Sequence, residues 1–424
     1  MTSLLALLAA ARIVTLQQAV DSARVNQPQL RQARAGTQAA AARAREAFSP
    51  MLPQVSARAG FQHSAGTVTV RNAACSADPT VPCATGVASG NTWSDNVTAT
   101  LLLFDFFTTP NRWEAAKAQA EAQAATERAT ELAVDFTVRQ AYFDAWADKA
   151  LVQVAQDTLT NQQKHLAQTE GFVKAGTHPE IDLAQARTDT ANARVALITA
   201  QNTYEVAKVT LNAAMGVLGP TDYDVADDAM PVVANEDADT QPLFDEAVKD
   251  RPEFASLEAL VRADQLTVRS IEGQYLPSIG ASAGVSQSGT RLTDLGWNAT
   301  VGVSATWLLF QGGQTRAQVA EAEANVAGEV AQLDLLRQTL RSDVDAARLA
   351  VRAAKESISA AQEALTNSKV RLTLAEQRYQ VGVGSAIEIG DAQVAVTQAA
   401  AQLVQADDKL ATARAQLLRA LGRR

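Results

Sequence analysis

The residues that could carry redox or metal chemistry are few in this 424-residue chain. Cys75 and Cys83 are its only cysteines, and they lie eight residues apart in a segment rich in Pro and Asp. If the chain is exported, this spacing favours a disulfide that closes a small loop, with two unpaired thiols as the alternative. The three histidines, His63, His165 and His178, are too scattered to indicate a metal site. We therefore expect neither a metal nor another cofactor.

Carboxylates are more numerous, and two of them share a helix face. Glu388 and Asp391 are three residues apart, a spacing that places both side chains on one side of a helix. A simpler role is also open for Glu388, because Ser385-x-x-Glu388 has the form of a capping box that starts a helix. Thr177-x-x-Glu180 offers the same interpretation at an earlier point of the chain.

Charge and motifs argue against two classes of function. The net charge is −9 with a pI of about 5.1, and no block of Lys or Arg stands out, so a nucleic-acid partner is not expected. The sequence contains no P-loop, no Gly-x-Ser-x-Gly and no Cys–His arrangement. Acidic pairs such as Asp407–Asp408 are typical of the solvated surface of Ala-rich helices. We therefore do not expect an enzyme.

The elements that carry these residues occur twice. Residues 104–216 align without a gap on residues 310–422, with an offset of 206. Near the start of each copy the offset is 224, since Leu52–Gly60 falls on Leu276–Gly284. The change of offset places 18 additional residues in the first copy, within 60–104, and we expect them to form a loop. The long period indicates a duplicated domain and not a short-repeat solenoid.

The chain divides into four expected parts. Residues 1–15, with the apolar start MTSLLALLAAAR, resemble the end of a secretory signal, and a first turn of a mature helix is the alternative. Two structural repeats follow, at 16–216 and 243–424, and the acidic, Pro-containing segment 217–242 is the expected linker between them. No run of 18 apolar residues occurs, so no transmembrane helix is predicted.

Each copy combines long helices with two short strands. In the first copy a helical pattern covers Leu16–Ala47, and a longer one runs from Pro110 almost to Pro179 before a last helix, Glu180–Met215. About 64 helical residues span about 95 Å, a length that indicates coiled-coil packing. The second copy repeats this order, with a long helix at 314–379, a turn at 381–385 and a last helix at 386–421.

The strands alternate between apolar and small polar residues. We expect them at 54–62, 96–103, 278–286 and 298–309, with a polar loop at 63–92. Strands of about ten residues match one bilayer crossing each, and the alternation is typical of a barrel with lipid outside and water inside. Because four strands cannot close a barrel, three chains sharing twelve strands are expected. The alternatives are a soluble sheet with one wet face and a coiled-coil rod without a lumen.

The duplicated order resembles the TolC-type outer membrane efflux protein family. The resemblance rests on the helix breaks NQPQL and DRPEF, the segments LLLFDFF and TWLLFQGGQTRAQVAEAEA, and the two Gly turns, and it covers residues 16–422. It implies a mainly α fold with a small β part, in a homotrimer whose twelve-stranded outer membrane barrel continues into a long periplasmic coiled-coil tunnel. It also implies docking to a periplasmic adaptor and an inner-membrane transporter, for efflux or type I secretion of drugs, ions or proteins.

The same resemblance implies roles for residues of the two turns. In the family's second turn, a Tyr, a Gly and two acidic residues belong to a periplasmic gate, and they are matched here by Tyr379, Gly382, Glu388 and Asp391. Asp182 matches the acidic partner of the Tyr. In a trimer the two acids would form stacked rings, which attract cations.

The turns themselves are implied to dock the adaptor. The residues concerned are Gly176, Thr177, Gly382, Val383 and Gly384. The family often has a basic residue at the position of Gly384, where it helps to hold the gate shut. That ion pair is therefore not implied for this chain. A tight helix C-cap is the alternative role for the glycines.

Overall fold

The computed structural model describes residues 12–70 and 84–424 of the chain. They form two compact units. Unit 1 is the described part of residues 1–37, together with 122–258 and 331–424. Unit 2 is the described part of residues 38–121, together with 259–330. Cys75 and Cys83, for which a disulfide is expected, lie outside the described residues.

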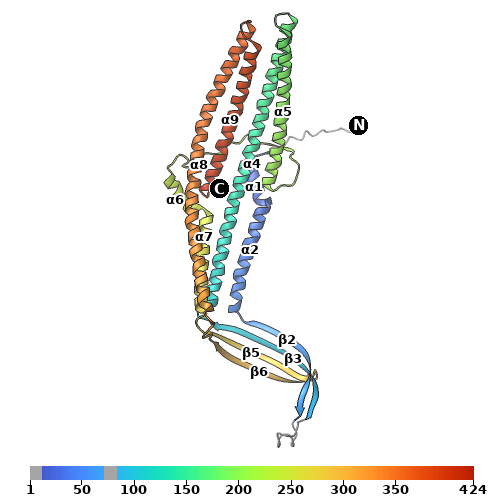
Figure 1. The fold of residues 1–424 in the computed structure, drawn as a ribbon, viewed down its shortest axis with the longest axis vertical. Helices are drawn as coiled ribbons and strands as arrows, with labels where there is room; N and C mark the ends of the chain where they lie inside the picture. Colours follow the sequence, from blue (N-terminus) through green and yellow to red (C-terminus); the bar gives the residue numbers. More distant parts are fainter. Residues whose placement is uncertain (1–11, 71–83) are drawn as a thin grey trace, which may run out of the picture. The chain divides into compact units, whose positions relative to one another are not determined.

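Two helical hairpins make up most of unit 1 (Figure 1). In the first hairpin α4 (Thr108–Lys174) is followed by α5 (Glu180–Met215), and in the second α8 (Gln314–Gln380) is followed by α9 (Ala386–Ala420). Each of the long helices α4 and α8 has 67 residues, as the matched copies predict. The buried seams are rich in Ala, which allows helices to approach closely. The helical hairpins expected from the sequence are thus present in both copies.

Shorter helices begin where prolines interrupt the helical pattern. α1 (Leu16–Asn26) ends before Pro28, which starts α2 (Pro28–Phe48), and α6 (Thr240–Asp250) ends before Pro252, which starts α7 (Pro252–Gly273). Proline is tolerated at the first helical position because its missing N–H would have no partner there. The equivalent breaks in the two copies therefore have the same local cause.

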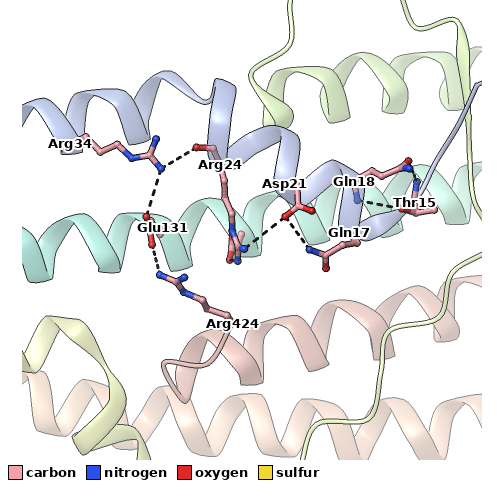
Figure 2. Close-up of polar contacts among 9 residues, drawn as sticks. Thr15, Gln17, Gln18, Asp21, Arg24, Arg34, Glu131 and Arg424 are labelled. Carbon is pink, nitrogen blue, oxygen red and sulfur yellow. Dashed lines mark hydrogen bonds and ion pairs between the residues drawn. The ribbon is translucent and has the colours of Figure 1, made fainter.

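Figure 2 shows how α1 begins and how Glu131 of α4 contacts two other segments of the same chain. The Thr15 hydroxyl accepts a hydrogen bond from the backbone N–H of Gln18 at 3.3 Å, and the Gln18 side chain accepts one from the N–H of Thr15 at 3.2 Å. This is a complete capping box. Glu131 of α4 forms ion pairs with Arg34 of α2 and with Arg424. These contacts join segments distant in sequence within unit 1.

The expected linker, residues 217–242, is folded onto the helices of unit 1. Its strand β4 (Tyr223–Val225) pairs in parallel with β1 (Arg12–Val14), a strand that falls inside the range expected as a signal remnant. Tyr142 of α4 donates its hydroxyl hydrogen to the carboxylate of Asp228 at 2.9 Å. The acidic residues of this segment are therefore hydrogen-bond acceptors for the first hairpin.

Another acidic residue of the same segment contacts the second hairpin. Glu236 accepts two hydrogen bonds from the guanidinium of Arg414 on α9, at 2.9 and 3.0 Å, and lies 2.7 Å from Nζ of Lys355 on α8. Although burial acts in the opposite direction, the hydrogen bonds from these two cations lower the pKa of Glu236 to about 2. The segment thus contributes to the fold of unit 1 through specific ion pairs.

Unit 2 contains a four-stranded antiparallel sheet in the order β2-β3-β5-β6. Its strands are β2 (Gln54–Val70), β3 (Ala84–Phe104), β5 (Ser278–Arg291) and β6 (Asp294–Thr306). Each copy therefore contributes one β-hairpin, and the two hairpins meet where β3 pairs with β5 (Figure 1). β2 and β6 are the outer strands, and each has one strand partner among the described residues.

In the register of all four strands, apolar residues lie opposite apolar residues, and small polar residues lie opposite one another or opposite glycine. On one face Ala57 is opposite Val97, Val97 is opposite Val285, and Ala283 is opposite Val301. On the other face small polar residues and glycines are aligned, as in the row Ser56, Thr98, Gly284 and Thr300. Because side chains alternate with period two, this register keeps one face apolar. The alternation expected from the sequence is therefore a property of the whole sheet.

The expectation of a polar loop at residues 63–92 is wrong at both ends of that range. Residues 63–70 continue β2 and residues 84–92 continue β3, paired with each other as far as Val70 and Ala84. Polarity suggested a loop, but Thr and Val alternate here and β-branched residues suit a paired strand. At least part of the additional length of the first copy therefore extends its β-hairpin.

The second β-hairpin is shorter than expected at its end. β6 stops at Thr306, so Trp307 and Leu309 lie beyond the strand. The indole N–H of Trp307 donates instead to the carbonyl oxygen of Tyr275 at 3.0 Å.

Candidate functional site

The turns that join the helices of each hairpin have matching backbones. Gly176 and Gly382 have φ angles of 73° and 76°, in the left-handed region that favours glycine. After Gly176, the N–H of Thr177 donates to the carbonyl of Phe172 at 3.0 Å, and the N–H of Val383 donates equivalently to Arg378 at 3.0 Å. These bonds satisfy carbonyls at the helix ends, as in a Schellman cap. Both glycines therefore have a conformational role in ending a helix.

The helices that follow the turns begin differently. The Ser385 hydroxyl accepts a hydrogen bond from the backbone N–H of Glu388 at 3.2 Å, so the Ser385 half of the capping box expected before α9 is present. The capping box expected at Thr177 and Glu180 is wrong, because the residue that caps α5 is Pro179, which has no side-chain acceptor. Instead, the Thr177 hydroxyl donates to the carbonyl of Phe172 at 3.0 Å.

Glu388 has an ion-pair partner in its own hairpin. Its carboxylate lies 3.4 Å from Nε of Arg378, and the two side chains are 40% and 58% exposed. At this exposure the pair contributes about 0–1 kcal/mol, because water screens the charges. Arg378 was not expected at the site, and its position next to Tyr379 gives no signal of this pairing in the sequence.

Gly384 leaves no room for the basic residue that the family often has there. A Cβ at this position would lie 2.8 Å from the backbone nitrogen of Tyr379 and 3.1 Å from Cβ of Arg378. Such distances require the turn to move. The tight turn therefore explains the glycine, and the cation near Glu388 comes from Arg378.

Asp391 follows Glu388 on the first turns of α9. It is exposed and lines a groove of about 500 Å³ between α9 and the helices of the first hairpin. Asp189 of α5 lines the same groove, together with the nearly buried amides of Gln162 and Gln393. The groove therefore presents two carboxylates and several amides from both hairpins.

Tyr379 is buried between the two hairpins. Its side chain is 2% exposed and packs with Ile389 and Ala392 of α9. Its ring centroid lies 4.8 Å from that of His178, 5.7 Å from His165 and 5.9 Å from Phe172, all of the first hairpin. His165 and Phe172 are seven residues apart, and this heptad spacing is the sequence signal that could have revealed them.

The hydroxyl of Tyr379 is buried and makes no hydrogen bond to any described residue. Burial raises the pKa of Tyr379, and the charge of Asp182 acts in the same direction. Asp182 is half-buried and its side chain forms no ion pair or hydrogen bond with the described parts of the chain. The structure therefore brings Asp182 near Tyr379 without bonding the two.

The expectation that Asp407 and Asp408 form a solvated acidic pair is wrong for Asp408. Asp408 is not part of a solvated pair, because one of its carboxylate oxygens is buried without a hydrogen bond to the described residues. Burial raises the pKa of Asp408 to about 6, and the charges of Asp144 and Asp148 on α4 act in the same direction. Burial also raises the pKa of Asp407. The cause is the packing of α4 along α9, which the sequence of α9 alone does not indicate.

Comparison with known proteins identifies the family. Within the described residues, no helix has both the length and the hydropathy required to cross a membrane. The model of the family described as outer membrane efflux protein matches residues 19–217 and 243–423. The chain belongs to the outer membrane efflux protein family. The family, the location in the outer membrane and the class of efflux channel expected from the sequence are confirmed.

Individual relatives are distant in sequence, whereas a solved structure is close in fold. The outer membrane efflux protein BepC of Brucella suis is 24% identical over 76% of this chain and 70% of its own length. The solvent efflux pump outer membrane protein SrpC of Pseudomonas putida is 27% identical over 67% of this chain and 61% of its own length. The crystal structure of CusC superposes with a TM-score of 0.81 at 22% identity, covering 96% of this chain and 92% of CusC. The expected fold class, mainly α with a small β part in a duplicated TolC-like arrangement, is confirmed.

Proposed function

We propose that this outer membrane efflux protein is the trimeric channel of a tripartite efflux or type I secretion system. One observation carries the proposal: a sheet with one apolar face, whose outer strands β2 and β6 each have one strand partner among the described residues. In hydrocarbon an unpaired strand edge is too costly, so β6 of one chain must pair with β2 of the next. Three chains then close twelve strands around a water-filled interior.

The helical hairpins would continue this channel into the periplasm and end at its gate. We propose that Glu388, Asp391, Tyr379 and Asp182 belong to the gate. Asp391 is the most available of them for a passing cation, because Glu388 is paired with Arg378 and Tyr379 is buried. Three copies of Asp391 around a threefold axis would form an acidic ring that attracts cations.

The tip turns would be the docking surface for a periplasmic adaptor, which connects to an inner-membrane transporter. Val383 is 67% exposed and the neighbouring Val381 is 73% exposed. A Cβ added to Gly176 or Gly382 would meet no atom within 4 Å, so the turns are open to a close approach. Exposed apolar side chains beside open backbone suit a protein partner.

Planar-bilayer recording tests the channel and its gate. We expect the purified wild-type protein to form trimers and to conduct. Glu388→Ala with Asp391→Ala should increase single-channel conductance and weaken block by divalent cations, because the acidic groups at the constriction are removed. Asp189→Ala is the matched control for a carboxylate that lines the groove on α5. Unchanged conductance and block in the double variant would remove both residues from the gate.

Membrane extraction distinguishes the proposed channel from the alternative hypothesis, a coiled-coil rod without a lumen. The apolar face of the sheet disfavours the rod, because a rod requires no bilayer-length strands. An integral barrel remains in the membrane fraction after washing with alkaline carbonate, whereas a peripheral rod is released. Release of the wild-type protein would contradict the channel.

A further inference from the structure

At the contact between the two hairpin tips, one side chain of the second hairpin meets three rings of the first. Tyr379 of α8 meets a seat formed by His165 and Phe172 of α4 and by His178 of the following turn. His178 is also stacked on Phe172, with ring centroids 4.8 Å apart. Two of the three histidines of the chain are therefore packed against one buried tyrosine. Such ring contacts stabilise the tip beyond the burial of their area.

The seat disfavours a positive charge on His165. This side chain is half-buried, and burial lowers the pKa of His165, with the charges of Asp189 and Asp182 acting in the opposite direction. The Tyr379 hydroxyl next to it makes no hydrogen bond to a described residue. The neutral imidazole is thus the form that fits the packed tip.

Carboxylates lie close enough to receive the charge once the ring leaves this position. On α5 they are Asp182 and Asp189, and on α9 Asp391 lines the same groove as Asp189. The other charged group beside Tyr379, Arg378 of α8, is engaged with Glu388. A protonated His165 would therefore gain by turning from the aromatic seat toward the acidic groove.

We propose that His165, Phe172 and His178 are positioning residues that hold the second tip against the first through Tyr379, and that protonation of His165 releases it. The inference rests on the proposed channel function, because the tip that moves carries Glu388 and Asp391. An imidazole whose pKa is lower in the closed tip favours the closed tip above its ordinary pKa of about 6.5. That preference is lost as the pH falls, by about tenfold in the closed–open equilibrium for each unit by which the two pKa values differ.

Conductance of the full-length trimer as a function of pH tests the release. Between about pH 7.5 and pH 5.5, where histidine titrates, we expect the conductance of the wild type to increase. His165→Phe keeps an aromatic ring in the seat and removes the titrating imidazole. This variant should remain at the low conductance of neutral pH throughout. His63→Phe, which replaces the third histidine on β2, should respond to pH as the wild type does.

Each result then decides between the alternatives. A wild type that conducts equally at both pH values overturns the proposed release, and so does a His165→Phe variant that retains the full response. If His165→Phe fails to assemble, His165→Gln keeps a neutral polar side chain and should reduce the pH response. Asp391→Asn should leave the pH response in place, which excludes titration of the acidic ring as its cause. A trimer without conductance at either pH would instead contradict the channel function itself.

Discussion

The two hairpin tips have the same backbone and different side chains. Their glycines, Gly176 and Gly382, take nearly the same left-handed conformation, and each is followed by the same pattern of backbone hydrogen bonds. The offset of 206 between the copies pairs His165 with Arg371, Phe172 with Arg378, His178 with Gly384, and Val173 with Tyr379. The first tip therefore contributes an aromatic seat, and the second contributes the aromatic ring that occupies it.

This difference shows how a duplicated turn can become an asymmetric contact. The backbone of a turn depends on a few local residues, so it survives while the side chains around it change. In the second tip Arg378 forms an ion pair with Glu388 of α9, whereas Phe172 at the matched position of the first tip packs against Tyr379. The tips are consequently not interchangeable, and variants at matched positions should behave differently.

The largest effect should follow from removing the ring that joins the tips. Tyr379→Ala removes a buried aromatic side chain, so we expect the free energy of local opening to fall by about 3–5 kcal/mol. Tyr379→Phe should be nearly neutral, because the buried hydroxyl has no hydrogen bond to a described residue to lose. Hydrogen exchange of the backbone amides in both turns measures the change. Equal effects of Ala and Phe would show that the hydroxyl has a partner after all.

A smaller effect is expected at Gly384, where the tips differ most in side-chain size. Gly384→Ala places a Cβ 2.8 Å from the nitrogen of Tyr379, and overpacking of this kind costs about 1–3 kcal/mol. Gly390→Ala is the matched control, since a Cβ there meets nothing within 4 Å and alanine favours a helix. Exchange in the second turn should accelerate for the first variant and slow for the second. No acceleration in Gly384→Ala would mean that the turn adapts.

The smallest effect is expected from variants at the first turns of α9 and α5. Ser385→Ala removes the cap of α9 and should destabilise its first turn by about 1 kcal/mol. Thr177→Ala should cost less, because its exposed hydroxyl bonds a carbonyl of the preceding helix and caps no N–H of α5. Amide exchange in the first turn of each helix compares them. Equal losses would contradict the different capping of the two tips.

Much of this architecture could be predicted from the sequence because its causes are local. α5 begins at Glu180 and α9 begins at Ala386 as expected, since Pro179 and Ser385 act within one turn of the chain. The strand positions and the apolar face followed from alternation with period two, which any paired register must respect. The candidate gate residues came from the resemblance to a family, and their roles remain predictions.

Other features needed the fold because they depend on residues far apart in sequence. The polar ends of β2 and β3 are strands because they pair with each other, although their composition is that of a loop. The pKa of Asp408 is raised because α4 packs beside α9, buries this carboxyl group and brings Asp144 and Asp148 near it. By itself the sequence determined the order, type and approximate ends of the elements, through the Pro, Gly and capping residues at their ends and through hydrophobic periodicity. Tertiary structure alone decided that His165, Phe172 and His178 surround Tyr379, because burial and aromatic contact arise only when two hairpins meet.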